Sequence, residues 1–165
     1  MKKINKITGI FILMLTLFSC AQEEFDPVVG VYTPSALEDV SGNYVLTEES
    51  ADNVFKTFNW SKADFGFPSA TSYVLQLAMA GKNFEGAIDL VTTTNLTYSI
   101  TVGALNQKLL AMGAKTNVAT DFEVRVNAIV NANVKTLNSN VSVMKILPYK
   151  VVIIYPSLYL PGNYQ

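Results

Sequence analysis

Two stretches decide the fold: Val54-Phe55-Lys56-Thr57-Phe58-Asn59-Trp60 and Thr71-Ser72-Tyr73-Val74-Leu75-Gln76-Leu77-Ala78-Met79. In both, large apolar side chains recur at every second residue, which is typical of β-strands with one buried face. Phe58 and Trp60 share a face of the first stretch, and one face of the second carries Tyr73, Leu75 and Leu77. We predict that these two faces meet in one core, with Trp60 and Tyr73 as structural residues.

A third strand is predicted from Phe122 to Ala128, where apolar residues again alternate with polar ones. Shorter strands are expected near residues 43–47, 88–93, 96–102 and 141–146; for the last, the pattern leaves open which face is buried. Helical spacing of Leu105, Leu109 and Met112, followed by Gly113, predicts one short helix over residues 103–112. About seven short strands separated by turn residues indicate an all-β antiparallel sandwich with one inserted helix.

The composition excludes several kinds of chemistry. Histidine is absent and cysteine occurs once among 165 residues. This removes Cys/His zinc sites, Ser-His-Asp and Cys-His nucleophilic machinery, and any internal disulfide. The net charge is −1, and three of the lysines lie in the first six residues, so the rest of the chain is more acidic and is unsuited to nucleic acid. We expect no cofactor, no metal and no enzymatic activity.

The first 19 residues have the features of a secretion signal. Lys2, Lys3 and Lys6 form a basic start, and residues 7–18 form an apolar run too short to span a membrane as a mature helix. The run ends at Leu17-Phe18-Ser19-Cys20, which resembles a relaxed bacterial lipobox; the resemblance implies cleavage before Cys20 and lipidation of its thiol. An ordinary signal peptide with an incidental cysteine is the alternative. Glu23-Glu24 resembles the acidic surface-export signal of Bacteroidetes lipoproteins, so we expect an outer-membrane, lipid-anchored protein that faces outward.

The order of the aromatic strands resembles a fibronectin type III or related immunoglobulin-like module, with Phe122 where that pattern has a tyrosine. Further motifs sharpen the resemblance: Trp60 to Gly66, Tyr73 to Ala78, Ala80 to Phe84, Leu105-Asn106, Phe122 to Ala128 and Ser139-Asn140. Together with the lipobox, these motifs look like the N-terminal domain of SusE-like outer-membrane lipoproteins.

This resemblance implies a surface protein that captures starch or another polysaccharide without cleaving it. It also implies a TonB-dependent transporter and a companion lipoprotein as partners. We therefore predict a signal peptide over residues 1–19, a lipid anchor and tether over 20–40, an immunoglobulin-like sandwich over 41–149, and the start of a truncated carbohydrate-binding domain over 150–165. In that family the immunoglobulin-like domain is a spacer and sugar is bound by the domains that come after it. An alternative hypothesis is that the sandwich is itself an interaction module that docks onto the transporter complex, which exposed apolar residues on the last strands would favour.

Few residues are candidates for a site. Sugars are usually held by aromatic faces, and Phe65, Phe67, Tyr159 and Tyr164 are the candidate carbohydrate-binding residues. Phe65 and Phe67 lie in a predicted loop and could be exposed. Asp121 and Glu123 lie two apart on one strand, which suggests a glycosidase carboxylate pair, but a solvent-facing charged ladder with Arg125 is the favoured interpretation. No residue is predicted to be catalytic.

Overall fold

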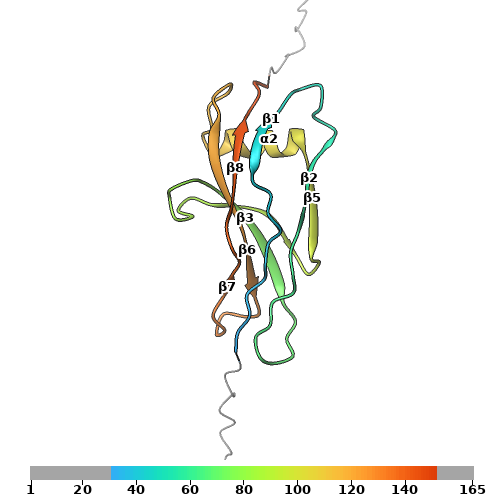
Figure 1. Ribbon diagram of the computed structural model, residues 1–165, viewed down its shortest axis with the longest axis vertical. Coiled ribbons are helices and arrows are strands. Elements are labelled where there is room, and N and C mark those ends of the chain that lie inside the picture. The colour runs from blue at the N-terminus through green and yellow to red at the C-terminus, as the bar shows by residue number, and fades with distance from the viewer. Residues whose placement is uncertain (1–30, 152–165) are drawn as a thin grey trace, which may run out of the picture.

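A computed structural model describes residues 31–151 (Figure 1). Within these residues, eight strands form a six-stranded and a two-stranded sheet. The larger sheet has the order β1-β8-β6-β3-β4, with β7 paired to β6, and the smaller contains β2 and β5. The larger sheet consists of β1 (Gly42–Val45), β3 (Ser72–Met79), β4 (Ile88–Thr93), β6 (Thr120–Ile129), β7 (Leu137–Asn138) and β8 (Ser142–Leu147), and the smaller of β2 (Val54–Asn59) and β5 (Thr97–Thr101).

The alternation predicted from the sequence is confirmed at the centre of the molecule. β6 pairs antiparallel with the whole length of β3, with Leu75 opposite Val126 and Leu77 opposite Val124. These side chains are fully buried, as is Phe58 of β2. They belong to one apolar core that also includes Trp60 and Tyr73, whose ring centroids lie 6.2 Å apart. Removal of this apolar surface from water is what drives the two sheets together.

The last strand buries the face carrying Ser142, Met144 and Ile146, whereas Val141 and Val143 are exposed. Strand β8 pairs antiparallel with β6 and parallel with β1, the parallel pair being an exception in an otherwise antiparallel sandwich. Its two neighbours place β8 inside the larger sheet.

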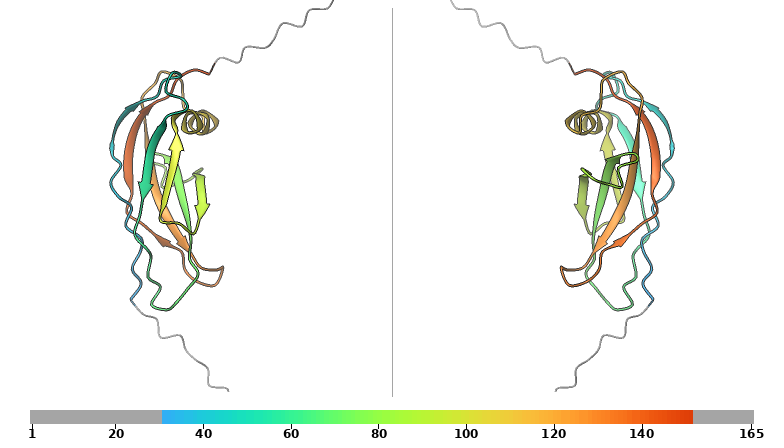
Figure 2. Two further views of the ribbon diagram at one scale, coloured as in Figure 1. Left: turned by 90° about the vertical axis from the view of Figure 1, so that its right-hand side faces the viewer. Right: turned by 90° about the vertical axis from the view of Figure 1, so that its left-hand side faces the viewer.

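The predicted helix is confirmed as α2 (Val102–Ala111). It begins at Thr101, whose hydroxyl accepts a hydrogen bond from the Ala104 amide at 3.3 Å. It ends before Gly113, which adopts a φ of 89° that an L-residue rarely tolerates. Leu105 and Leu109 are fully buried, so α2 covers one end of the sandwich (Figures 1 and 2).

The sandwich begins earlier in the chain than the sequence predicted. Residues 31–40 were expected to belong to a tether, but Leu37 and Val40 are buried in the core. The Thr33 amide and carbonyl exchange two 2.8 Å hydrogen bonds with Asp64, and Leu37 forms a bridge with Trp60. The boundary at residue 41 is therefore wrong, because this segment is held by residues distant in sequence. The 150–165 prediction lies almost wholly outside the described residues.

Candidate functional site

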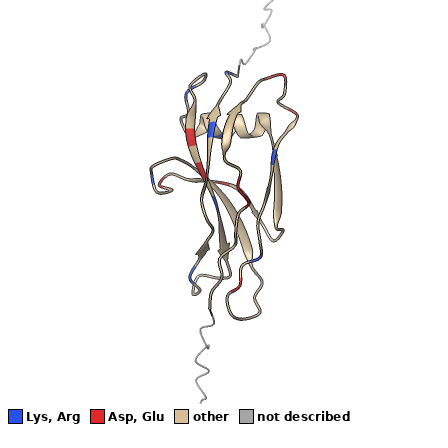
Figure 3. Cartoon of the chain, in the orientation of Figure 1, with Lys and Arg blue, Asp and Glu red and all other residues tan. Residues whose placement is uncertain are grey.

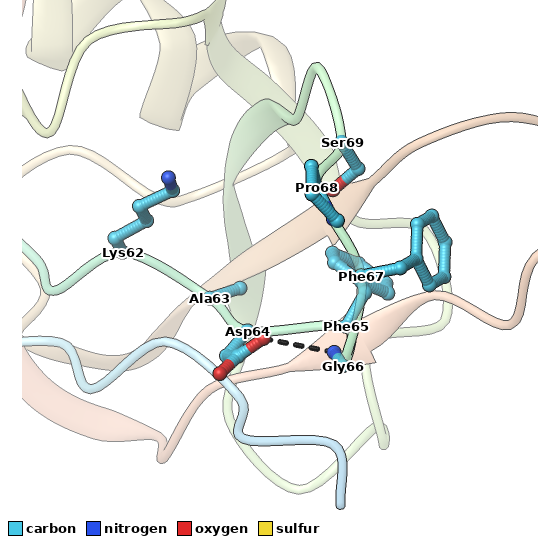
Figure 4. A pocket seen from close by; sticks show the side chains of 8 residues that line it. All are labelled: Lys62, Ala63, Asp64, Phe65, Gly66, Phe67, Pro68 and Ser69. Carbon is cyan, nitrogen blue, oxygen red and sulfur yellow. Dashed lines mark hydrogen bonds between the residues drawn. The ribbon is translucent and has the colours of Figure 1, made fainter. Parts of the chain in front are cut away.

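The loop between β2 and β3 surrounds a hollow in the surface of the sandwich. This hollow, of about 540 Å³, is open to solvent and is lined by residues 62–69 (Figure 4). A smaller hollow of about 240 Å³ shares Lys62 and Ser69 with it and extends toward Thr94 and Leu96. Both hollows lie near the end of the sandwich at which the described chain begins, because Asp64 pairs with Thr33.

Hydrogen bonds to a tyrosine of β3 and within the loop itself hold the loop in place. The Tyr73 hydroxyl accepts a hydrogen bond from the Ala63 amide at 3.2 Å, which ties the loop to β3. The Asp64 carboxylate accepts one from the Gly66 amide at 2.8 Å, and Gly66 has a φ of 75°. One of the two carboxylate oxygens of Asp64 is therefore engaged in the hydrogen bond that stabilises this turn.

The two candidate aromatic residues of this loop have different environments. Phe65 is 1% exposed and its ring lies 6.5 Å from that of Tyr32, so the expectation that it could lie exposed in the loop is wrong. The physical reason is that Phe65 closes the end of the core together with Ala63. Phe67 is 41% exposed and leaves part of its ring available. Tyr159 and Tyr164 lie outside the described residues.

The hollow offers limited binding chemistry. Ligand sites usually combine an enclosed apolar surface with a few converging polar groups. Figure 4 shows Lys62 and Phe67 pointing to different sides of the loop, so the cation and the exposed ring do not converge on one ligand. A single half-exposed ring can contact one sugar unit, and a role for Phe67 stays a prediction.

Asp121 and Glu123 are engaged on the outer face of β6. Asp121 forms an exposed ion pair with Lys145 at 3.6 Å, and the Glu123 carboxylate accepts a hydrogen bond from the Gly81 amide at 3.2 Å. Both carboxylates thus face outward, as the ladder interpretation predicted. Among residues 31–151, no group of three or more Cys, His, Asp or Glu side chains is placed to hold a metal ion.

A polar network on the same face was not predicted from the sequence. Arg125 was expected to continue the charged ladder, but its guanidinium lies 3.9 Å from the Phe84 ring centroid and donates two hydrogen bonds to the Gln76 side chain. Gln76 also accepts from Asn127 at 2.7 Å and donates to Asp89 at 3.0 Å. The available signal was that Gln76 and Arg125 occupy outward positions of two paired strands. Charged residues of both signs are distributed along the sandwich (Figure 3).

Asparagine side chains hold both places at which the chain joins the sandwich. Asn140 accepts a hydrogen bond from the Leu37 amide at 2.8 Å and donates one to the Leu37 carbonyl at 3.0 Å. Asn106 is fully buried in α2. Its side chain accepts a hydrogen bond from the Tyr149 amide at 3.0 Å and donates one to the Tyr149 carbonyl at 3.1 Å. Each amide replaces the backbone of a neighbouring strand. We call these two arrangements the Asn140 clamp and the Asn106 clamp.

Next to the Asn140 clamp, the Asp39 carboxylate accepts hydrogen bonds from the Ser142 hydroxyl at 2.7 Å and from the Ser41 amide and hydroxyl. These bonds, with that from Ser142 the strongest cause, lower the pKa of Asp39 from its ordinary value to about 2. The carboxylate is ionised at neutral pH, where it joins residues 33–41, which we call the entry segment, to β8.

The strand order defines the class of protein. A sheet in which β8, β6, β3 and β4 are neighbours, facing a sheet of β2 and β5, is an immunoglobulin-like β-sandwich. A family model described as SusE outer membrane protein matches residues 22–127, more than half of the chain, and the chain belongs to this family. The resemblance noted from the sequence motifs is thereby confirmed.

Two solved structures are among those similar to this chain. One is the solution structure of the fibronectin type III domain of human fibronectin type III domain containing protein 3, with 21% identity, a TM-score of 0.35, and coverage of 56% of this chain and 72% of that one. The other is a crystal structure of chicken CNTN1 FN1-FN3 domains, with 16% identity, a TM-score of 0.37, and coverage of 73% of this chain and 35% of that one. A comparison with curated proteins found no match. Within residues 31–151, no helix is both long and apolar enough to cross a membrane.

Proposed function

We propose that this chain is the anchored spacer of a surface lipoprotein that captures polysaccharide for uptake without cleaving it. The carrying observation is that the described chain begins and ends at opposite ends of the long axis, where the ribbon is blue and red, with a filled core between them (Figures 1 and 2). A domain built in this way increases the distance between the segments attached to its two ends. Membership of an outer-membrane protein family is consistent with this role.

Two further parts of the proposal concern the ends of the chain. Cys20 would carry the lipid that anchors the protein in the outer membrane, since each methylene group of an acyl chain buried in the membrane adds about 0.8 kcal/mol of affinity. The anchored protein would face outward from the cell. The polysaccharide, starch or a related glycan, would be bound by a domain located after residue 150, to which Tyr159 and Tyr164 would belong. In cells, Cys20→Ser is expected to move the protein out of the membrane fraction, and protease added to intact cells is expected to digest the wild-type protein. Retention of the variant in the membrane would contradict the anchor.

Titration calorimetry tests the spacer role. Residues 21–165, checked for monodispersity, are titrated with maltooligosaccharides and a panel of other glycans. We expect no saturable heat from a well-folded sample. Saturable binding would overturn the spacer role, and loss of that heat in Phe67→Ala, compared with the exposed control Val118→Ala, would place the site at the loop between β2 and β3.

A second candidate function is docking onto a TonB-dependent transporter and its companion lipoprotein. The observation that favours it is a pair of exposed valines on neighbouring strands, Val45 of β1 at 69% and Val143 of β8 at 44% exposure. We expect the double variant Val45→Ser/Val143→Ser to lose co-purification with the transporter after mild solubilisation. Val54→Ser, which alters an exposed valine of the other sheet, is the matched control. Unchanged co-purification of the double variant would reject this surface.

A further inference from the structure

The two ends of the described chain are connected to neighbouring parallel strands. β1 is reached from the end at Val31, and β8 leads to the end at Val151. The strands pair in parallel register, with Gly42 opposite Met144 and Val45 opposite Leu147. A force that separates the two ends therefore pulls β1 and β8 in opposite directions along their length. It also loads the backbone hydrogen bonds that hold Thr33 to Asp64 and Glu38 to Asn59, which lie between Val31 and β1.

This direction of loading is the most resistant one for a pair of strands. The hydrogen bonds of a parallel ladder are evenly spaced and connect the strands sideways. Sliding one strand past the other stretches all of these bonds together, whereas peeling the strands from one end breaks them one after another. A pair of strands is thus much harder to separate by sliding the strands past each other than by peeling them apart from one end.

The Asn140 clamp lengthens the pair beyond the strands themselves. It binds Leu37, and the Ser142 hydroxyl accepts a hydrogen bond from the Val40 amide at 3.0 Å. Beyond the other end of β1, the Leu46 amide donates to the Leu147 carbonyl at 3.0 Å. The connection between the entry segment and β8 is therefore continuous from Leu37 to Leu46.

The exit of the chain is held separately. After β8, the Asn106 clamp fixes both backbone polar groups of Tyr149 to a buried side chain of α2. A pull on Val151 must break these bonds before it reaches β8. Each end of the sandwich thus has a clamp that bears load before or together with the strand pair.

From this geometry we infer that the sandwich is a load-bearing element, in which tension between its two ends is resisted by the β1–β8 pair and the two asparagine clamps. The inference rests on the proposed spacer function, in which the membrane holds one end and a captured polysaccharide pulls on the other. A polymer attached to its source exerts such a pull on any protein that holds it.

Single-molecule force measurements test the inference by changing only the direction of pulling. Residues 21–165 contain the described sandwich and no cysteine. In one variant, handles are attached through Val31→Cys and Val151→Cys, which loads β1 and β8 along their length. In the other, Glu49→Cys replaces Val31→Cys; because residues 49 and 151 both come after the carboxyl ends of parallel strands, this pair peels β1 from β8.

We expect the first variant to unfold at least roughly tenfold more slowly than the second at the same force, since several hydrogen bonds must break at once. Both variants should show the same urea midpoint, which confirms that only the direction differs. Asn140→Ala should shorten the lifetime in the first geometry roughly tenfold and leave the peeling lifetime unchanged. Thr57→Ala, which removes a side-chain hydrogen bond between β2 and β5, is the control and should change neither.

Equal lifetimes in the two directions would overturn the inference. That outcome would leave the spacer proposal intact, because a domain can provide distance without resisting force. Conversely, saturable sugar binding in the calorimetry would reject the spacer proposal without altering the ratio of the two lifetimes.

Discussion

Strand β6 and the entry segment, residues 33–41, are attached to the sandwich by different interactions. β6 lies between β3 and β8, and its inward residues Phe122 and Val124 are fully buried. The entry segment contributes only Leu37 and Val40 to the core. Hydrogen bonds attach it on two sides, to the Asn140 and Ser142 side chains and to the backbone of residues 59–64. Apolar burial thus dominates at β6, whereas hydrogen bonds decide where and in which direction the chain joins the sandwich.

The largest effect is expected from a cavity in β6. Phe122→Ala removes a fully buried ring, and such substitutions lower the free energy of unfolding by about 3–5 kcal/mol. This is a large share of the roughly 5–15 kcal/mol that stabilises a typical domain. Urea denaturation followed by tryptophan fluorescence measures the change. Val143→Ala, at a half-exposed position of neighbouring β8, should stay within about 1 kcal/mol of wild type.

A loss smaller than about 1 kcal/mol for Phe122→Ala would contradict the central place of β6, because a residue packed on all sides cannot be truncated so cheaply.

An intermediate effect is expected at the Asn106 clamp. Asn106→Ala removes two hydrogen bonds to Tyr149 and should lower the free energy of unfolding by about 1–3 kcal/mol. The Tyr149 amide should also exchange its hydrogen faster than in the wild type, which tests the clamp directly. Gln107→Ala, at the next and exposed position of α2, is the matched control and should leave both quantities unchanged. Slow exchange at Tyr149 in Asn106→Ala would show that other groups hold the exit of the chain.

The same contrast explains what could be predicted from the sequence. Alternation is a local property, so Phe58, Leu75 and Val124 could be assigned to the core from their neighbours in sequence alone, and the structure confirms them. The helix was predictable for the same reason, since its spacing and Gly113 lie within one short stretch. Local patterns therefore sufficed for the centre of the sandwich.

The errors concern contacts that no local pattern records. Leu37 is bound by Asn140, 103 positions later in the chain, and the three-residue spacing of Leu37 and Val40 does not show the alternation of a strand. Phe65 was assigned to a loop correctly, but its ring belongs to the core together with Ala63 and lies near Tyr32, which the sequence pattern had assigned to a tether. The sequence of the loop alone does not record which of its aromatic rings packs into the core. The clamps could not be recognised either, because a buried asparagine in α2 has no signature until its partner is placed.

The smallest effect is expected from acid, at the junction between the entry segment and β8. The pKa of Asp39 is lowered to about 2 in the folded protein by its hydrogen bonds to Ser142 and Ser41, and is higher in the unfolded chain. Because the folded pKa is the lower one, the unfolded state binds the proton more readily, so this carboxylate stabilises the fold above about pH 4. The contribution should be lost as the pH falls from about 4 to 2.

Asp39→Asn separates this contribution from the titration of the other carboxylates. The amide oxygen of asparagine can still accept the hydrogen bonds from the Ser142 hydroxyl and the Ser41 amide, which both go to one carboxylate oxygen of Asp39. The amide nitrogen replaces the other oxygen and can donate to the Ser41 hydroxyl, so the junction should be retained while its charge is removed. Urea midpoints measured at steps between pH 7 and pH 2 should therefore fall less steeply below pH 4 in the variant than in the wild type. Glu38→Gln, at the adjacent exposed residue, should track the wild-type curve. Parallel curves for Asp39→Asn and the wild type would mean that the charge of Asp39 adds nothing to the attachment of the entry segment. The attachment would then depend on the Asn140 clamp and on the burial of Leu37 and Val40.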